Sequence, residues 1–299
     1  MHVFVTGATG FIGSAVVRDL LDAGHHVVGL ARSEQGALAL KAAGAGVHRG
    51  DLDDPDGLRG PAAAADGVIH LAYRHDLLAD GDLTAAGAVD VRAVEALGAA
   101  LGGSGKPLVY ASGTAIAQSP GGPATEEDGP AADTHRSPAE NAVTALAGQG
   151  VRAGVVRLPP TVHGEGDHGF VPALIGFARA HGVSAYVGDG ANRWPAVHRL
   201  DAAPLFRLAL ETAPAGSRLH AVADEGVPFR DIATVIGRRL DLPVVGLSGD
   251  EAAAHFSWLT RFAGLDVPAS SALTRQRTGW RPVHPGLVAD LEEGHYFTA

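Results

Sequence analysis

The sequence predicts an α/β fold in which a doubly wound parallel sheet of the Rossmann type carries a smaller C-terminal substrate lobe. Short apolar runs that suit strands buried on both faces alternate with segments of helical spacing, which is typical of a parallel sheet covered by helices. The first apolar run ends in a glycine-rich turn, and this turn opens the first helix. The chain has 299 residues, enough for one large core and an additional small lobe.

Strands and helices are expected to alternate along the first two thirds of the chain. The strands are expected at residues 2–6, 26–30, 47–49, 67–71, 108–112, 151–158 and 219–222. The helices are expected at residues 13–23, 36–43, 83–101 and 138–147. After residue 158 the pattern loosens into glycine-rich loops and proline breaks. We therefore predict a Rossmann domain at residues 1–162 and 195–224, and a substrate-binding lobe at residues 163–194 and 225–299.

Composition and charge exclude several classes of function. The sequence contains no cysteine, which excludes disulfide bonds and thiolate chemistry and fits a reducing cytoplasm. The formal net charge is −10 and no basic block occurs, so neither nucleic acid nor an anionic membrane is expected as a partner. No apolar run approaches the ~18 residues of a membrane span, and the chain starts directly in an apolar strand. We expect a cytoplasmic protein that acts on a small-molecule substrate.

The glycine turn at residues 6–13 has the spacing of a dinucleotide-binding turn. Gly7 allows the tight turn, Gly10 lets the backbone approach a pyrophosphate, and Gly13 permits close packing of the helix on the strand. The N-terminus of the helix then offers backbone amides and its positive dipole to the phosphates. The residues of this turn that are expected to bind the cofactor are Gly7, Thr9, Gly10, Phe11, Ile12 and Gly13.

The end of the second strand predicts which cofactor is bound. An NAD site usually has an acidic residue there to hold the ribose hydroxyls, whereas this chain has Ala31 and Arg32. An arginine can pair with the 2′-phosphate of NADP(H). We therefore expect NADP(H) to be preferred over NAD(H). The alternative is that Arg32 is an ordinary solvated surface residue.

Further motifs stand in a characteristic order along nearly the whole chain. They are Gly50-Asp51-Leu52, His70-Leu71-Ala72, the segments 156–159, 162–164 and 197–201, and Gly279-Trp280-Arg281-Pro282. Together with the glycine turn, they resemble the motifs of the extended-type short-chain dehydrogenase/reductases, which are NAD-dependent epimerase/dehydratase-like proteins. The resemblance implies that Asp51, with Leu52, contacts the adenine, and that Leu71 and Ala72 lie beside the cofactor ribose.

The chain departs from that family at its catalytic pair. Typical members carry Tyr-x-x-x-Lys before the sixth strand, where the tyrosine exchanges a proton with the substrate and the lysine lowers its pKa and holds the ribose. In such members a glutamate commonly lies four residues after the lysine, and Glu140, which stands 17 residues before Arg157, resembles this glutamate. The resemblance then implies that Ala132 occupies the tyrosine position and Arg136 the lysine position. No tyrosine occurs between residues 110 and 186. The chain therefore resembles an atypical subgroup that lacks the pair, and Arg136 remains a candidate cofactor ligand.

Other groups must then supply the proton that accompanies hydride transfer. Tyr73 follows the fourth strand and is the tyrosine that the predicted fold places near the nicotinamide; the alternative is an aromatic wall of the substrate pocket. Ser112 and Thr114 lie at the end of the fifth strand, where the family keeps a hydroxyl. His163 begins the substrate lobe and is a candidate general acid; the alternative is a loop whose polar groups bond to its own backbone.

The remaining candidates concern the substrate and a metal ion. The side chains expected to contact the substrate are His75, His168, Tyr186 and Trp194. No metal is expected, because no known ligand spacing occurs; the one conceivable group is His163, Glu165, Asp167 and His168. Trp258 and Phe262 stand four residues apart and are expected on the core face of a helix.

The leading functional hypothesis is an NADPH-dependent oxidoreductase that reduces a carbonyl or C=N group of a small organic substrate. A second hypothesis is a sugar-nucleotide epimerase or dehydratase, which is disfavoured because those enzymes generally use the missing tyrosine–lysine pair. A third is a non-catalytic NADP(H)-binding redox sensor, which is disfavoured because the substrate-lobe loops are intact. The resemblance also implies a homodimer formed through the alanine-rich helices at residues 83–101 and 138–147.

Overall fold

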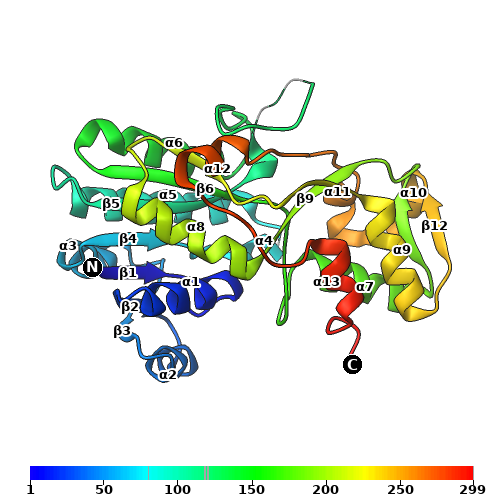
Figure 1. Ribbon diagram of the computed structural model, residues 1–299, viewed down its shortest axis with the longest axis horizontal. Coiled ribbons are helices and arrows are strands. Elements are labelled where there is room, and N and C mark those ends of the chain that lie inside the picture. Colours follow the sequence, from blue (N-terminus) through cyan, green and yellow to red (C-terminus); the bar gives the residue numbers. More distant parts are fainter. Residues whose placement is uncertain (80, 118, 120, 299) are drawn as a thin grey trace.

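The centre of the computed structural model is a parallel sheet of seven strands in the order β10-β6-β5-β4-β1-β2-β3 (Figure 1). The structure describes residues 1–79, 81–117, 119 and 121–298. The strands of this sheet are β1 (His2–Thr6), β2 (His26–Ala31), β3 (Gly46–Arg49), β4 (Gly67–His70), β5 (Pro107–Gly113), β6 (Arg152–Leu158) and β10 (Arg218–His220). The strand order reverses at β1, and ligands bind beside such a reversal at the carboxyl ends of the strands. The predicted doubly wound α/β fold is confirmed.

Helices cover both faces of the sheet and divide its core in two. The helices on one face are α1 (Phe11–Asp22), α2 (Glu34–Ala42) and α8 (Arg199–Thr212). Those on the other face are α3 (Pro55–Ala64), α5 (Leu83–Leu101) and α6 (Ser137–Leu146). Fully buried side chains such as Phe206 and Leu97 each stabilise these layers by roughly 1.5–3 kcal/mol. Among the described residues, no helix combines the length and the apolar character that crossing a bilayer requires.

A smaller lobe lies beyond the carboxyl ends of the strands (Figure 1). Its strands form a three-stranded sheet and a two-stranded parallel sheet: β7 (Thr161–His163), β9 (Arg193–His198) and β11 (Asp224–Pro228), then β8 (Ser184–Val187) and β12 (Val244–Leu247). Its helices are α7 (Phe170–His181), α9 (Phe229–Leu240), α10 (Gly249–Phe256), α11 (Thr260–Ala263) and α13 (Leu287–Glu293). The lobe has its own apolar core, in which Trp194, Phe229 and Phe256 are buried.

The chain returns to the large sheet after the lobe helices. α12 (Ala272–Thr278) packs against α8 and β10 rather than against the lobe. Trp280 follows α12 and is buried in the core that α8 covers, and its indole Nε1 donates to the carbonyl of Asp201 at 2.8 Å. The carboxylate of Asp201 accepts hydrogen bonds from the backbone N–H groups of Val283 and His284. The C-terminal segment is therefore part of the Rossmann core before it re-enters the lobe at α13.

Every predicted strand and helix has an observed counterpart whose ends differ by two residues or fewer, and the helix expected at residues 83–101 is α5 with the same bounds. Three helices were not predicted from the sequence: α3, α8 and a short helix, α4 (His75–Ala79). Pro61 lies inside α3 and Pro204 inside α8. A proline inside a helix removes one backbone hydrogen bond, so its presence argues against a helix when the pattern is read locally. Packing against the sheet overrides that local preference here.

The prediction for Trp258 is wrong. α10 ends at Phe256, and Trp258 lies in a 3-10 turn at Ser257–Leu259, so its spacing to Phe262 does not place both side chains on one helix face. Trp258 is 58% exposed, whereas Phe262 packs against the lobe core.

Candidate active site

The glycine turn joins β1 to α1 and brings backbone into contact with backbone. Gly7 has φ +68°, and a Cβ at this position would lie 2.6 Å from the backbone nitrogen of Ala72. A Cβ at Gly13 would overlap the carbonyl group of Gly7. Gly10 is the N-cap of α1 and has no side chain that could occupy the first amides of the helix. These amides and the helix dipole are therefore available to a pyrophosphate, as a dinucleotide-binding turn requires.

Two arginines stand at the ends of β2 and β3. Arg32 directly follows β2 and is exposed. Arg49, the last residue of β3, is in register with Ala31, and its Nη1 donates to the carbonyl of Ser33 at 2.5 Å. Arg49 was not among the residues expected to bind the cofactor, although it ends the third predicted strand. Both residues therefore lie at the carboxyl ends of β2 and β3, the edge of the sheet at which ligands bind in this class of fold.

The other residues predicted to hold the adenosine and ribose lie on loops at the same edge: Asp51, Leu52, Leu71 and Ala72. The Asp51 carboxylate accepts a hydrogen bond from the N–H of Asp53 at 3.1 Å. The N–H groups of Leu71 and Ala72 donate to the carbonyl and the hydroxyl of Thr6, at 3.2 and 3.3 Å. The loop after β4 is thus attached to the strand that leads into the glycine turn.

A chain of buried polar contacts runs from β1 through β4 to α5 and β5. The hydroxyl oxygen of Thr6 lies 2.6 Å from His70 Nδ1, and His70 Nε2 lies 3.3 Å from one carboxylate oxygen of Asp90. The hydroxyl of Tyr110 donates to the other carboxylate oxygen at 2.5 Å. Burial raises the pKa of Asp90, but the hydrogen bond from His70 and the charge of Arg136 outweigh that effect and lower it. Asp90 is therefore ionised and serves as the acceptor of the chain.

Arg136 joins this chain just before α6. Its Nη2 donates to the carbonyl of Ala111 at 2.7 Å and to the hydroxyl of Tyr110 at 3.3 Å, and it lies 3.9 Å from Asp90. Burial disfavours the charged form, but the acidic groups of Tyr110 and Asp90 outweigh burial and raise the pKa of Arg136. The guanidinium is therefore a permanent cation. Within the described residues its buried Nε has no hydrogen-bond partner.

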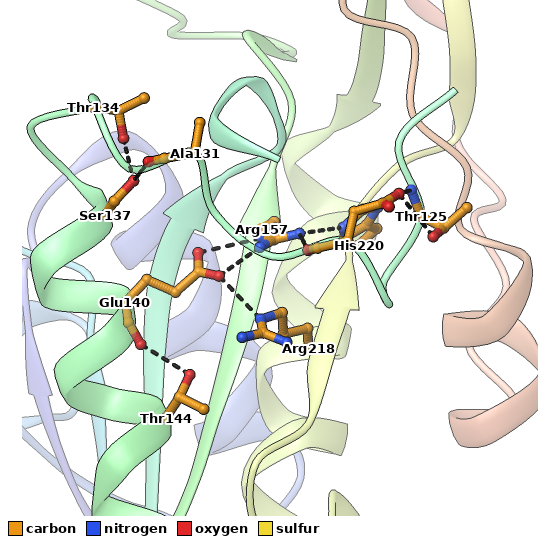
Figure 2. Close-up of polar contacts among 10 residues, drawn as sticks. Thr125, Ala131, Thr134, Ser137, Glu140, Thr144, Arg157, Arg218 and His220 are labelled. Carbon is orange, nitrogen blue, oxygen red and sulfur yellow. Dashed lines mark hydrogen bonds and ion pairs between the residues drawn. The ribbon is translucent and has the colours of Figure 1, made fainter. Parts of the chain in front are cut away.

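A buried ion pair holds α6 against β6 (Figure 2). Nη2 of Arg157 lies 2.5 Å from Oε1 of Glu140, and both side chains are fully buried. Arg218 donates to the same oxygen at 3.2 Å, and Arg157 also donates to the carbonyl of Asp128 at 2.8 Å. The two residues whose spacing set the register in the sequence are thus in direct contact. This contact positions the helix that begins immediately after Arg136.

Tyr73 lies three residues beyond β4, with its ring against Arg136. The guanidinium carbon is 4.2 Å from the ring centre, and the rings of His75 and His135 are 5.3 and 6.3 Å away. The hydroxyl of Tyr73 is buried and has no hydrogen-bond partner among the described residues. Burial raises the pKa of Tyr73 to about 12, against the opposing charge of Arg136. The phenol is therefore protonated at neutral pH.

Two more hydroxyl groups without partners lie at the end of β5. Ser112 belongs to the strand and Thr114 begins the 3-10 turn Thr114–Ile116; both are buried, and neither side-chain oxygen has a partner in the part of the chain that the structure describes. The hydroxyl of Tyr73, which follows β4, and Nε of Arg136, whose Nη2 donates to Ala111 on β5, are two further unsatisfied polar groups near the carboxyl ends of these adjacent strands. Native proteins pair nearly all buried polar groups, so this concentration indicates the place where a ligand binds.

His75 and His168 come from two different segments of the chain. His75 begins α4, whereas His168 lies in the loop after β7 and packs edge-on against Phe11 of the glycine turn, at 5.9 Å between ring centres. Burial, followed by the charges of Arg136 and His168, lowers the pKa of His75. The guanidinium of Arg199, at the start of α8, lies 4.9 Å from the same Phe11 ring.

Three side chains of this region were missed in the sequence: His135, Arg199 and Arg261. Burial and the charges of Arg136 and Arg261 lower the pKa of His135. His135 directly precedes Arg136, and Arg199 lies within the segment 197–201 that resembles a family motif, so both signals were available in the sequence. Arg261 had no such signal, because it reaches this region only through the fold of the lobe.

His163 belongs to a different group of residues. Its side chain is fully buried, its Nδ1 lies 2.8 Å from Oδ2 of Asp290, and its ring packs against that of His198 at 5.4 Å. No contact among the described residues joins it to Tyr73. A pocket of about 370 Å³ borders this group and is lined by Glu165, His198, Arg199, Leu200, Asp290, Glu293 and His295.

The four residues considered for a metal do not converge. The Asp167 carboxylate accepts hydrogen bonds from the hydroxyl of Tyr296 at 2.9 Å and from the N–H of Gly169 at 2.7 Å, while His168 faces Phe11. A different set of possible ligand atoms lies within 4.8 Å of one another, beside the pocket: Asp290, Glu293 and His295.

Tyr186 and Trp194 lie in the core of the lobe. Trp194 is fully buried, packs against Phe229 at 4.8 Å between ring centres, and donates its indole N–H to the carbonyl of Phe262 at 3.2 Å. Tyr186 packs against the same core from β8. The contacts of Trp194 are those of a packing residue, and its side chain presents no surface to a substrate.

Comparison with known proteins agrees with this architecture. Residues 3–222 match the model of the NAD dependent epimerase/dehydratase family. An uncharacterized protein of Schizosaccharomyces pombe is 51% identical over 298 residues, covering 99% of this chain and 100% of that one. The 2-alkyl-3-oxoalkanoate reductase of Stenotrophomonas maltophilia is 29% identical over 261 residues, covering 82% of this chain and 77% of that one.

The fold is also that of solved structures. The dTDP-glucose 4,6-dehydratase DesIV of Streptomyces venezuelae, with NAD and TYD bound, matches with a TM-score of 0.78 at 20% identity, over 98% of this chain and 96% of that chain. At this level of identity the likeness concerns the fold alone. The match to the family model, by contrast, covers the glycine turn and every strand of the central sheet. The chain belongs to the NAD-dependent epimerase/dehydratase family.

Proposed function

We propose that the protein is an NADP(H)-dependent reductase that reduces a carbonyl or C=N group of a small organic substrate, with Tyr73 as the proton donor. The observation that carries this proposal is the hydroxyl of Tyr73, which is buried and lacks a partner among the described residues, on a ring whose centre lies 4.2 Å from the guanidinium carbon of Arg136. The Stenotrophomonas relative supports the reaction class, because its name states the reduction of an oxoalkanoate.

The residues present fit a dinucleotide. Side chains are excluded at Gly7 and Gly13, and the N-terminus of α1 carries no side-chain cap. Arg32 and Arg49 would bind the 2′-phosphate that distinguishes NADP(H) from NAD(H). When bound, the reduced cofactor supplies a hydride to the carbonyl carbon. Arg136 would hold the ribose through its Nε, in place of the family's lysine.

Tyr73 is suited to giving its proton to the substrate oxygen. A pKa of about 12 keeps the phenol protonated at neutral pH, yet the phenol is a stronger acid than the alcohol formed when a carbonyl accepts a hydride. The guanidinium of Arg136 stabilises the phenolate left behind, which then recovers a proton from water. The hydroxyls of Ser112 and Thr114 would donate hydrogen bonds to the same substrate oxygen as negative charge develops on it.

The test follows the nicotinamide absorbance of NADPH in the presence of ketones, aldehydes and imines. Tyr73→Phe should lower kcat by roughly 10²–10⁴-fold, the range for loss of a general acid, while the Kd for NADPH stays the same. Arg59→Gln, at an exposed position in α3, serves as the control and should leave both values unchanged. NADPH binding without turnover across the whole panel would contradict a reductase and favour a redox sensor. Full activity in Tyr73→Phe would reject Tyr73 as the donor.

A further inference from the structure

Three side chains that can bind a metal ion come together at the end of α13. Asp290 and Glu293 stand three residues apart, so they share one face of the helix. The helix ends at Gly294, whose φ of +91° lets the chain turn and bring His295 back toward them. One possible ligand atom of each side chain lies within 4.8 Å of those of the other two. We call Asp290, Glu293 and His295 the α13 cluster.

The imidazole of the α13 cluster has no hydrogen-bond partner at its Nε2. This nitrogen of His295 is buried, forms no hydrogen bond within the described residues, and lies 3.8 Å from Oδ2 of Asp290. The separation is too long for a hydrogen bond. Two ligands of one tetrahedral Zn²⁺ lie about 3.4 Å apart when each bond is ~2.1 Å, so a small movement brings both atoms onto a single ion. A bound metal would therefore satisfy this nitrogen.

A fully buried histidine, His163, binds the carboxylate of Asp290. Its Nδ1 lies 2.8 Å from Oδ2, and the Asp290 side chain is only 3% exposed. Nε2 of His163 is also buried and has no partner in the described part of the chain, and its ring packs against His198, which lines the same pocket as the α13 cluster. In known metal sites a hydrogen bond of this kind orients a ligating carboxylate. His163 would therefore position a metal ligand rather than transfer a proton at Tyr73.

The pocket beside the α13 cluster, of about 370 Å³, favours a cation. Three carboxylates line it, those of Glu165, Asp290 and Glu293, together with a single arginine, Arg199. The guanidinium of Arg199 lies 4.9 Å from the ring centre of Phe11. Within the described residues, neither Glu165 nor Glu293 forms an ion pair, and Asp290 is paired with histidines alone. The lining therefore carries an excess of negative charge.

The other basic groups near the pocket do not compete with a metal ion. His198 is not a ligand, because its Nδ1 accepts a hydrogen bond from the N–H of Leu200 and its Nε2 must then carry the ring proton. Burial lowers the pKa of His198 to about 4, so the ring is neutral. Arg239 packs against Gly294 and lies over the ring of Phe297 at 5.4 Å, and among the described residues it forms no ion pair with the α13 cluster. The carboxylates of the cluster therefore remain available to a metal ion.

We infer that the α13 cluster binds one divalent ion of the Zn²⁺ type and that Glu165, on the loop after β7, completes the ligand set. Imidazole together with carboxylates suits Zn²⁺ and its neighbours among the transition metals, whereas Mg²⁺ and Ca²⁺ take oxygen ligands. The ion fastens the end of α13 to the loop whose His168 packs against Phe11 of the glycine turn. This structural role is independent of the proposed reductase. The spacing of the ligands along the sequence is not a familiar pattern, which is why no metal was expected.

Calorimetric titration of the full-length protein with zinc chloride, after treatment with a chelator, tests the inference at neutral pH. One Zn²⁺ should bind per chain, and an excess of Mg²⁺ should not displace it. Glu293→Gln and Glu165→Gln each remove an exposed ligand and should weaken zinc binding by at least about tenfold. Glu292→Gln is the matched control: it removes the same charge from the same helix, where Glu292 pairs with Arg238, and should leave the zinc affinity unchanged. In thermal unfolding, Zn²⁺ should raise the Tm of the natural protein and of the control by more than that of the other two variants.

Absence of zinc binding overturns the inference. So does equal zinc affinity in Glu293→Gln and the natural protein, since the ion would then lie on histidines elsewhere in a chain that has 15 of them. Mg²⁺ that binds as tightly as Zn²⁺, and still binds after His295→Gln, would show that carboxylates alone hold the ion, which also overturns the inference. Normal zinc binding in Glu165→Gln would refute the link to the loop after β7. Spermidine binding that Glu293→Gln abolishes, without any zinc binding, would identify the pocket as a site for an organic amine instead.

Discussion

The guanidinium carbon of Arg136 lies 4.2 Å from the centre of the Tyr73 ring, although the two residues are 63 positions apart in the chain. The cation stands at the start of α6, and the phenol comes from the loop after β4. A tyrosine and a basic residue therefore meet at the carboxyl ends of the strands without the Tyr-x-x-x-Lys spacing. The pair is built from two elements, which the Glu140–Arg157 ion pair and the sheet hold in register.

Replacing Arg136 by glutamine should lower kcat by roughly 10–100-fold, because the phenolate formed at Tyr73 loses the cation above its ring. Arg136→Lys should recover part of this loss, since it restores the charge but not the planar contact. Steady-state kinetics on protein whose thermal unfolding is measured in parallel checks this expectation. A lower Tm with an unchanged kcat per folded molecule would show that Arg136 acts only in packing.

The raised pKa of Tyr73 predicts an asymmetry between the two directions of the reaction. An acid with a pKa of about 12 is fully protonated at neutral pH, so the rate of reduction should not respond to titration of this residue between about pH 6 and 9. The reverse oxidation needs the phenolate, whose fraction rises about tenfold per pH unit below the pKa. Initial rates in both directions across this range provide the measurement. A pKa of about 12 for Tyr73 would be contradicted by the following result: the reduction rate of the natural protein falls with an apparent pKa near neutrality, and that of Tyr73→Phe does not.

The two arginines at the ends of β2 and β3 predict the cofactor preference. Arg32→Ala and Arg49→Ala should each weaken NADPH binding by roughly tenfold and leave NADH binding unchanged, since only NADPH has the 2′-phosphate. Nicotinamide fluorescence titrations of the natural protein and both variants with each cofactor give the six dissociation constants that are compared. The NADP(H) assignment fails if the natural protein binds NADH as tightly as NADPH and neither substitution affects binding.

The buried ion pair predicts a large effect on stability. Glu140→Gln removes the carboxylate that both Arg157 and Arg218 contact, and it leaves a fully buried guanidinium without its counter-charge. Breaking such a pair from one side costs about 3–5 kcal/mol of the free energy of unfolding. Urea unfolding of this variant can be compared with Glu127→Gln, which removes an exposed partner of Arg277 and should change stability by less than about 1 kcal/mol. Similar losses in the two variants would show that the buried pair contributes little.

The sequence predicted those features that depend on local pattern. The three glycines of the glycine turn lie within one short segment. A Cβ at any of them would crowd backbone atoms of neighbouring residues or of the segment beside the turn. Glu140 and Arg157 served in the sequence only to set the register of the absent catalytic pair, and their ion pair is a finding of the structure. The information in the glycine turn, by contrast, lies in one short segment whose geometry is fixed by β1 and α1.

The features that the sequence did not predict depend on contacts between distant segments. The partner of His163 is Asp290, 127 residues further along the chain, so nothing near His163 signals that its ring is buried. Trp194 is an aromatic residue of the kind that often lines a pocket, but it is buried in the core of the lobe. Arg261 comes near His135 only because the lobe folds back onto the sheet. A local pattern tells which face of an element is apolar, but not which element will cover it.

The contact between Trp280 and Asp201 bears on how this molecule can be divided. The chain leaves the large sheet after β6, returns at α8, leaves again at β11 and comes back once more at Trp280 before ending in the lobe. A single cut near residue 222 would therefore remove α12 from the sheet and α9 from the lobe at the same time. Because each part is built from separate stretches of the chain, no single cut separates them, and a proteolytic nick between them should leave the fragments bound to each other.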